Sequence, residues 1–207
     1  MATPRSQRIG ILIIAIVMIA GTLGSFLIMG LSINNQKIDQ AQLEKASNDY
    51  ELKVAMQTME LSGKYYGDFS TYISIPASFS ADGITELTTK DLKIGDGEEI
   101  KSGDLYSAYY IGWNPKGVIF DQSITDGTLK EPITGGNLII GWEEGVIGMK
   151  VGGVRELTIP SDKAYGVNGS GENIPANTPI KFIVMIIPKV EEIPVPEILQ
   201  QYYANNY

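Results

Sequence analysis

The first part of the chain carries one long apolar segment. Residues 9–33 contain no charged side chain, and a helical run of roughly 25 such residues is long enough to cross a bilayer core of about 30 Å. Arg5 and Arg8 precede the run and acidic residues follow it, so the positive-inside rule places residues 1–8 in the cytoplasm. A cleaved signal peptide is the alternative, but the run exceeds a usual signal core and no clear cleavage motif follows. The pattern therefore predicts a single-pass signal-anchor in the cell membrane, with the rest of the chain extracytoplasmic.

A weaker helical pattern follows the apolar segment. Between residues 36 and 62, apolar positions recur at imperfect helical spacing. This pattern favours a helical stalk that ends at Gly63 and Gly67. A short dimerisation helix is the alternative, but the heptad pattern is too irregular for a coiled coil. The stretch from Tyr65 to Gly83 mixes aromatic residues with Ser, Pro and Gly, which is typical of an irregular linker. We expect stalk and linker together to occupy residues 34–83.

From residue 84 the pattern changes to short β-prone runs separated by turns that contain Gly, Asp and Pro. The predicted strands cover residues 87–94, 105–112, 118–121, 154–159 and 180–187. One brief helix is expected around residues 142–147. Such an order of elements predicts a small antiparallel α+β domain over residues 84–190. The tail, residues 191–207, is expected to form a turn or two of helix and then fray.

Composition limits the chemistry that this domain can perform. The chain has no cysteine and no histidine, which excludes disulfides, thiolate metal sites, Cys nucleophiles, Ser-His catalysis and most zinc sites. The formal net charge is −8, and the part beyond Arg8 is more acidic still. Such a domain repels phosphate backbones, so no nucleic-acid partner is expected. Any catalysis here must need little proton transfer.

Several aromatic residues of the predicted domain stand beside glycines or turn signals, where side chains tend to line concavities. Trp142 starts the brief helix, although an ordinary core position is the alternative. Asp121 follows Phe120 at the end of a predicted strand, where it either caps a turn or lies at the rim of an aromatic basin. A basin with so few charges suits a neutral, apolar ligand such as a proline ring.

Several motifs of this region occur together and in a fixed order. They are residues 109–112 (YYIG), 120–121 (FD), 140–153 (IGWEEGVIGMKVGG), 157–160 (LTIP), 164–166 (AYG) and 173–175 (NIP). In this combination they resemble the FKBP-type peptidyl-prolyl cis/trans isomerases, over about residues 102–189. The resemblance implies a strongly curved antiparallel sheet wrapped around one short α-helix, with a pocket between them and no cofactor or metal.

The resemblance also implies a set of pocket residues. The catalytic residues would be Asp121, Tyr165, Phe182, Tyr110 and Phe120, and the substrate-binding residues would be Trp142, Leu138, Ile139 and Ile174. In this arrangement Trp142 is the floor under the proline ring. The Ile139 N–H and the Tyr165 hydroxyl would be donors to substrate carbonyls.

The chain departs from the family pattern at the rim of this pocket. The loop from Ser123 to Asn137 is slightly short and lacks the usual aromatics, so Leu129 and Ile133 are loose candidates for that wall. Ser170 and Asn173 stand where the best-known members carry a His and an apolar residue. These departures leave open the preference for the residue before proline and the affinity for macrolide inhibitors.

Rotation about an X–Pro bond makes and breaks no bond, so it needs neither the cysteine nor the histidine that the chain lacks. The expected partners are therefore proline-containing polypeptides, newly exported ones above all, with macrolide inhibitors as candidate ligands and the bilayer around residues 9–33. A membrane-tethered chaperone or peptide-binding module with weak or no isomerase activity is the alternative, and a structural role for paired stalks is a further one. The layout of short anchor and cysteine-free domain is typical of bacteria.

Overall fold

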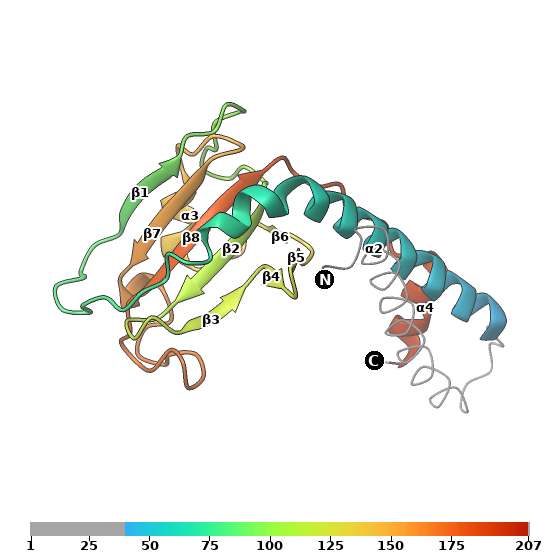
Figure 1. Cartoon of the computed structure of the whole chain (residues 1–207). Coiled ribbons are helices and arrows are strands. Elements are labelled where there is room, and N and C mark those ends of the chain that lie inside the picture. The colour runs from blue at the N-terminus through green and yellow to red at the C-terminus, as the bar shows by residue number, and fades with distance from the viewer. Residues whose placement is uncertain (1–39, 207) are drawn as a thin grey trace, which may run out of the picture. The chain divides into compact units, whose positions relative to one another are not determined.

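The computed structural model describes residues 40–206 (Figure 1). The predicted membrane segment, residues 9–33, and the predicted cytoplasmic segment, residues 1–8, lie outside the described residues. Between residues 40 and 206, no helix combines the length and the apolar character that crossing a membrane requires. The described chain divides into a compact unit of residues 60–191 and a smaller unit formed by residues 40–59 and 192–206.

The larger unit is built on an antiparallel sheet with the strand order β1-β7-β8-β2-β3 (Figure 1). Its strands are β1 (Thr88–Lys93), β2 (Ser107–Trp113), β3 (Ile119–Gln122), β7 (Val154–Ile159) and β8 (Ile180–Ile187). The short β6 (Ile133–Thr134) pairs with β2, while β4 (Ile124–Thr125) and β5 (Thr128–Leu129) form a separate hairpin. The antiparallel α+β prediction is confirmed, and each of the five predicted strands is present. Strands β4, β5 and β6 went unpredicted because two residues show no periodicity.

Strand β8 is apolar over residues 182–187 because both of its faces are covered. Phe182, Val184 and Ile186 belong to one hydrophobic cluster, together with residues of α3 (Ile140–Val146). Ile183, Met185 and Ile187 belong to a second cluster on the other face. A strand buried on both faces needs an unbroken apolar run rather than alternation, and residues 180–187 supply it.

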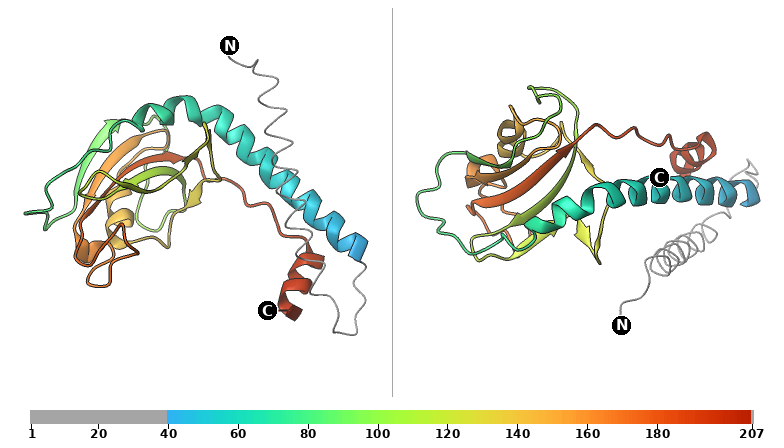
Figure 2. Two further views of the ribbon diagram at one scale, coloured as in Figure 1. Left: turned by 60° about the horizontal axis from the view of Figure 1, so that its bottom comes forward. Right: turned by 45° about the horizontal axis from the view of Figure 1, so that its top comes forward.

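The second face of the sheet is covered by the end of α2 (Gln40–Phe69), as Figures 1 and 2 show. Ser62, Tyr65, Tyr66 and Phe69 follow the spacing of one helical face. The Phe69 ring is fully buried, with its centroid 6.2 Å from that of Tyr109. This packing makes the end of the helix a part of the domain core.

The prediction that Gly63 and Gly67 end this helix is wrong, and so is the prediction that an irregular linker begins at Tyr65. Both glycines are exposed, and each costs a helix only about 1 kcal/mol relative to alanine. Burial of the opposite face outweighs that cost, because a buried aromatic ring contributes about 1.5–3 kcal/mol. The helix therefore continues to Phe69 and passes into a 3₁₀ turn, η2 (Ser70–Tyr72).

The smaller unit contains the first part of α2 and a C-terminal helix, α4 (Glu197–Asn206). Leu199 and Tyr202 of α4 are buried against Leu43 of α2. This ten-residue helix is longer than the turn or two expected for the tail. The helical pattern of the tail is weak by itself, and the contact of α4 with Leu43, far away in sequence, stabilises the helix.

The buried end of α2 leads to a test of stability. In a fragment of residues 40–206, Phe69→Ala should lower the free energy of unfolding by about 3–5 kcal/mol, because it leaves a cavity against Tyr109. Met56→Ala, in the same helix but 58% exposed, should change it by less than about 0.5 kcal/mol. Urea unfolding followed by tryptophan fluorescence measures both. Equal effects of the two substitutions would mean that the end of α2 is not part of the core.

Candidate functional site

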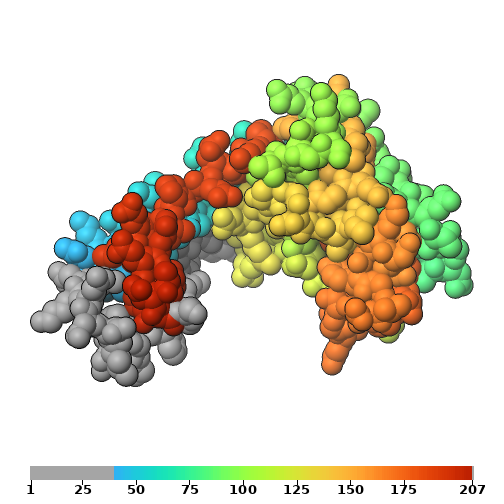
Figure 3. Space-filling view, turned by 180° about the vertical axis from the view of Figure 1, so that it is seen from behind, coloured from blue at the N-terminus to red at the C-terminus, as the bar shows by residue number. Residues whose placement is uncertain are grey.

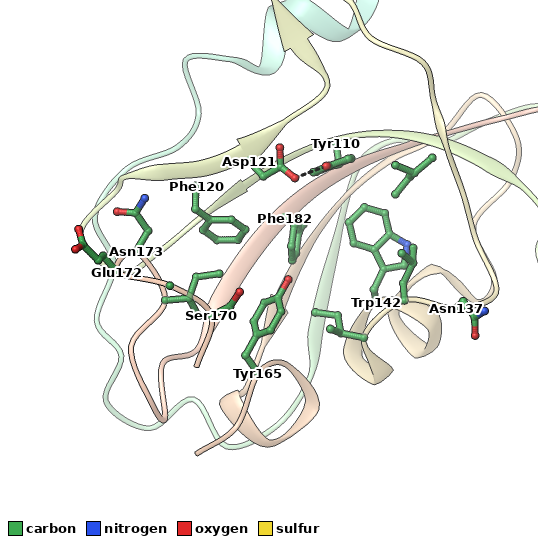
Figure 4. Close-up of a pocket in the computed structure, with 15 residues that line it drawn as sticks. Tyr110, Phe120, Asp121, Asn137, Trp142, Tyr165, Ser170, Glu172, Asn173 and Phe182 are labelled. Atoms are coloured by element: carbon green, nitrogen blue, oxygen red, sulfur yellow. Dashed lines mark hydrogen bonds between the residues drawn. The ribbon is translucent and has the colours of Figure 1, made fainter. Parts of the chain in front are cut away.

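A cavity of about 570 Å³ opens on the α3 side of the sheet (Figure 4). Strands contribute Tyr110 (β2), Phe120 and Asp121 (β3) and Phe182 (β8), and α3 contributes Trp142. Leu138 and Ile139 precede α3, while Tyr165 and Ile174 lie in the segments that follow the 3₁₀ turn η3 (Ser161–Lys163). In the space-filling view the segment around residues 160–176 (orange) lies beside that around residues 130–146 (yellow) (Figure 3). The structure thus places all nine residues singled out in the sequence around one cavity.

Aromatic rings in edge-to-face contact form the floor and one wall of the cavity. The Trp142 ring, 3% exposed, lies 4.9 Å from the Phe182 ring with an angle of 73° between the planes. Phe120 meets Phe182 at 5.5 Å and 86°, and Tyr110 meets Trp142 at 5.6 Å and 82°. Such contacts stabilise the rings beyond their burial and fix their orientation. The cluster is an apolar surface of the size and shape that a small ring can cover.

The close packing of this cluster requires a glycine at position 112. Gly112 lies on β2 opposite Phe182 of β8 and Asp121 of β3. A Cβ atom at this position would lie 2.4 Å from the Phe182 ring and 2.8 Å from the Phe120 ring, well inside van der Waals contact. Sequence reasoning noted Gly112 only as part of a motif. Its spatial role follows from strand register, which the sequence does not show.

A polar pair on the wall joins Tyr110 to Asp121. The Tyr110 hydroxyl donates to Asp121 Oδ2 at 2.5 Å (Figure 4), and the backbone N–H of Gln122 donates to Asp121 Oδ1 at 2.8 Å. Burial, and then the hydrogen bond to Asp121, raise the pKa of Tyr110 above its ordinary value. The buried Ser123 in turn accepts from the Tyr110 N–H through its side chain, at 2.9 Å. The phenol is thereby held as a neutral donor.

Two hydrogen-bond donors at the cavity have no partner among residues 40–206. The Tyr165 hydroxyl faces the cavity and its pKa is raised, first by burial and then by the Asp121 charge (Figure 4). The carbonyl of Ile139 accepts from Trp142 and Glu143 at 2.9 and 3.2 Å, whereas the Ile139 N–H makes no hydrogen bond within the described residues. Both donors are therefore available to carbonyl oxygens of a ligand.

The rim is formed by a tight loop that a buried asparagine holds. The Ser170 N–H donates to the Ile174 carbonyl at 2.7 Å, which closes the loop. Asn114, 5% exposed at the end of β2, donates from Nδ2 to the Asn173 carbonyl at 2.8 Å. Sequence reasoning missed Asn114, because an Asn-Pro-Lys-Gly turn explains it without any long-range partner.

Ile133 and Leu129, the two loose candidates for the wall formed by the shortened loop, lie on opposite sides of the sheet. Ile133 lines the cavity, whereas Leu129 is buried in the cluster on the other side of the sheet. The candidate role of Leu129 in the wall is therefore wrong. Its N–H donates to Ser62 Oγ of α2 at 2.9 Å, so β5 belongs to the face that α2 covers.

Comparison with known proteins gives consistent matches. Residues 96–187 match the family described as FKBP-type peptidyl-prolyl cis-trans isomerase. An FK506-binding protein of Neisseria meningitidis serogroup B is 39% identical over 105 residues, which are 49% of this chain and 94% of that protein. FK506-binding protein 4 of Rhizopus delemar is 37% identical over 101 residues, and this chain spans only 26% of its length. A solved peptidyl-prolyl cis-trans isomerase from Pseudomonas syringae pv. tomato aligns with a TM-score of 0.44 at 27% identity, covering 64% of this chain and 92% of that one.

The buried phenols predict how stability depends on pH. The pKa values of Tyr106, Tyr109, Tyr110 and Tyr165 are raised, mainly because burial disfavours the phenolate. Above about pH 10 the unfolded chain releases protons that the folded chain still holds. The free energy of unfolding should therefore be constant with respect to these groups below about pH 10 and fall above it.

Urea unfolding between about pH 8 and 11, read together with phenolate absorbance, tests this expectation. These four phenols should ionise only as the protein unfolds, separately from the more exposed of the 11 tyrosines. A single ionisation of all tyrosines near pH 10 in the folded protein would contradict it.

Proposed function

Because this chain belongs to the FKBP-type peptidyl-prolyl cis-trans isomerases, we propose that it catalyses cis/trans isomerisation of X–Pro peptide bonds in the aromatic cavity. The observation that carries the proposal is the combination of a Trp142 floor with two donors that have no partner within residues 40–206, the Tyr165 hydroxyl and the Ile139 N–H. An apolar surface of aromatic rings with donors beside it fits a proline and the carbonyl groups that flank it.

The physical demands of the reaction agree with this site. Amide resonance opposes rotation with a barrier of roughly 18–20 kcal/mol, and rotation removes the charge separation of the planar amide. The twisted amide is therefore less polar than the ground state, and a water-poor cavity favours it. A ten-thousand-fold acceleration needs about 5.5 kcal/mol. Ring burial and one or two hydrogen bonds are of that magnitude.

Each group of residues has a distinct task in this proposal. The rings of Trp142 and Phe182 hold the proline ring, while the donors of Ile139 and Tyr165 hold the carbonyls on either side. The Tyr110–Asp121 pair places a carboxylate at the wall, where its negative charge faces the carbonyl carbon of the twisting bond. No step requires a nucleophile or a proton shuttle.

Substrates should therefore be polypeptides that expose an X–Pro bond. The charged residues among those that line the cavity are Asp121 and Glu172, and both are acidic. Macrolides related to FK506 are candidate inhibitors, since they would occupy the same apolar floor.

The activity is tested by exchange of a short X–Pro peptide, followed by NMR, with residues 40–206. Wild type should accelerate exchange, and Asp121→Ala should lower kcat/KM by about tenfold through loss of the wall charge. Asp82→Ala, which removes an exposed carboxylate outside the cavity, is the control and should have no effect. A folded wild-type fragment without acceleration would refute the proposal and favour a module that only binds peptides.

We further propose that residues 9–33 anchor the chain in the cell membrane, with the isomerase domain on the extracytoplasmic side. The support is the charge-free apolar run and the position of Arg5 and Arg8 before it. Newly exported polypeptides would then be the natural clients, because slow X–Pro bonds delay their folding. A bacterial source stays a prediction from the layout of the chain.

Fractionation and protease accessibility test the anchor. The full chain should sediment with membranes and resist alkaline extraction, and a variant that lacks residues 9–33 should not. Protease added to protoplasts or spheroplasts, whose cytoplasmic membrane is intact and exposed, should digest the domain. A domain that is digested only after the cytoplasmic membrane is opened would reverse the orientation.

A further inference from the structure

Three side chains, Trp142, Tyr106 and Glu143, are joined by hydrogen bonds behind the floor of the cavity, and only Trp142 lines the cavity itself. Trp142 Nε1 donates to the Tyr106 hydroxyl at 3.0 Å, and that hydroxyl donates to Glu143 Oε2 at 3.2 Å. Tyr106 is 2% exposed and Trp142 is 3% exposed. Neither Tyr106 nor Glu143 lines the cavity. The floor residue is therefore held from the side that a substrate cannot reach.

The same carboxylate also holds a wall of the cavity. Glu143 Oε1 accepts from the backbone N–H groups of Gly136 and Leu138, at 2.8 and 3.1 Å. Leu138 and its neighbour Ile139 line the cavity. One oxygen of Glu143 thus fixes the loop that carries the wall, and the other connects, through Tyr106, to the floor.

The Tyr106 ring is fixed in place by the same loop. The Gly135 N–H donates to the Tyr106 carbonyl at 3.0 Å, and a Cβ atom on Gly135 would lie 2.2 Å from the Tyr106 ring. The loop therefore lies directly against this ring. A phenylalanine would fill the same apolar space, so packing alone does not account for the hydroxyl. The two hydrogen bonds do.

A second buried tyrosine three residues further along provides the contrast. Tyr109 is fully buried on the other face of the sheet, and its hydroxyl has no hydrogen-bond partner among residues 40–206. The second tryptophan provides another contrast, since Trp113 Nε1 donates to the Ala77 carbonyl at 3.1 Å, away from the cavity. Tyr109 is therefore a matched control for Tyr106, and Trp113 is a matched control for Trp142.

We propose that Tyr106 is a positioning residue of the isomerase, through which Glu143 fixes the Trp142 indole and the wall loop in one relative arrangement. The inference rests on the proposed function, because positioning matters only if the floor holds a proline. A buried indole N–H without an acceptor is costly, so removal of the hydroxyl lets the ring tilt or admits water behind it. Either change weakens contacts to the transition state without removing any atom that touches the substrate.

The test compares Tyr106→Phe with Tyr109→Phe in the full chain, solubilised in detergent micelles. Each substitution deletes one buried phenolic oxygen, on opposite faces of the sheet. Tyr106→Phe should lower kcat/KM for a short X–Pro peptide by roughly fivefold to tenfold, whereas Tyr109→Phe should leave it unchanged. Equal kcat/KM values for the two variants would overturn the inference.

A second readout follows the indole directly and needs no activity. Tryptophan labelled at the indole nitrogen gives one N–H signal for each of the two tryptophans. In Tyr106→Phe the solvent exchange of the Trp142 signal should become about tenfold faster, while the Trp113 signal keeps its wild-type rate. A merely structural role would change both signals together, and an unchanged Trp142 signal would overturn the inference.

Glu143→Gln leaves the hydrophobic core unchanged and tests the Glu143 end of the series of hydrogen bonds. One amide oxygen can serve either the wall loop or Tyr106, so this variant should also lower kcat/KM and accelerate Trp142 exchange. Combined with Tyr106→Phe, it should lower kcat/KM little further, because both substitutions break the same connection between Glu143 and Trp142. If wild type proved inactive, the proposed function would fail, and the exchange of the Trp142 signal would still decide the positioning inference.

Discussion

An apolar cavity in a folded protein has to be braced, because side chains that gain contacts by closing it would otherwise fill it. Here the bracing is the edge-to-face set of Tyr110, Trp142, Phe120 and Phe182. Each ring supports the next at an angle that leaves the floor open. Gly112 makes this possible, because any side chain there would clash with the Phe120 and Phe182 rings and displace them.

Bracing of the cavity depends in turn on a sheet that is held from both sides. Tyr109 and Tyr110 are neighbours on β2 that face opposite clusters, with Tyr110 at the cavity and Tyr109 against Phe69 of α2. Movement of β2 away from the cavity would therefore compress the α2 face. Arg155 adds a fixed point on the cavity side, since it donates to the Gly145 and Ile147 carbonyls at the end of α3, at 2.9 and 3.0 Å. A positively charged residue near a helix C-terminus also interacts favourably with the helix dipole.

The sequence predicts the elements that carry a strong local signal, and it fails where a contact between distant segments decides. Residues 180–187 and 154–159 were located to the residue because both runs are bounded by turns or proline. The end of α2 was misjudged, since Gly63 is a stop signal locally and only the buried Phe69 shows otherwise. The nine cavity residues came from motif resemblance, whereas Asn114 and Tyr106 act through partners that no spacing reveals.

The distribution of polar groups on the two sides of the floor fits the proposed rotation about an X–Pro bond, which reduces the charge separation of the amide. On the cavity side, burial raises the pKa values of Tyr110 and Tyr165, so both remain neutral donors throughout the physiological range. Behind the floor, Glu143 places its charge against backbone N–H groups and a phenol rather than against the ligand. A further carboxylate directly under the floor, in addition to Asp121 at the wall, would attract water to the apolar surface that the proposed reaction needs dry. The Tyr106 hydroxyl resolves this conflict, because it gives the Trp142 indole a neutral acceptor and keeps the charge one side chain further away.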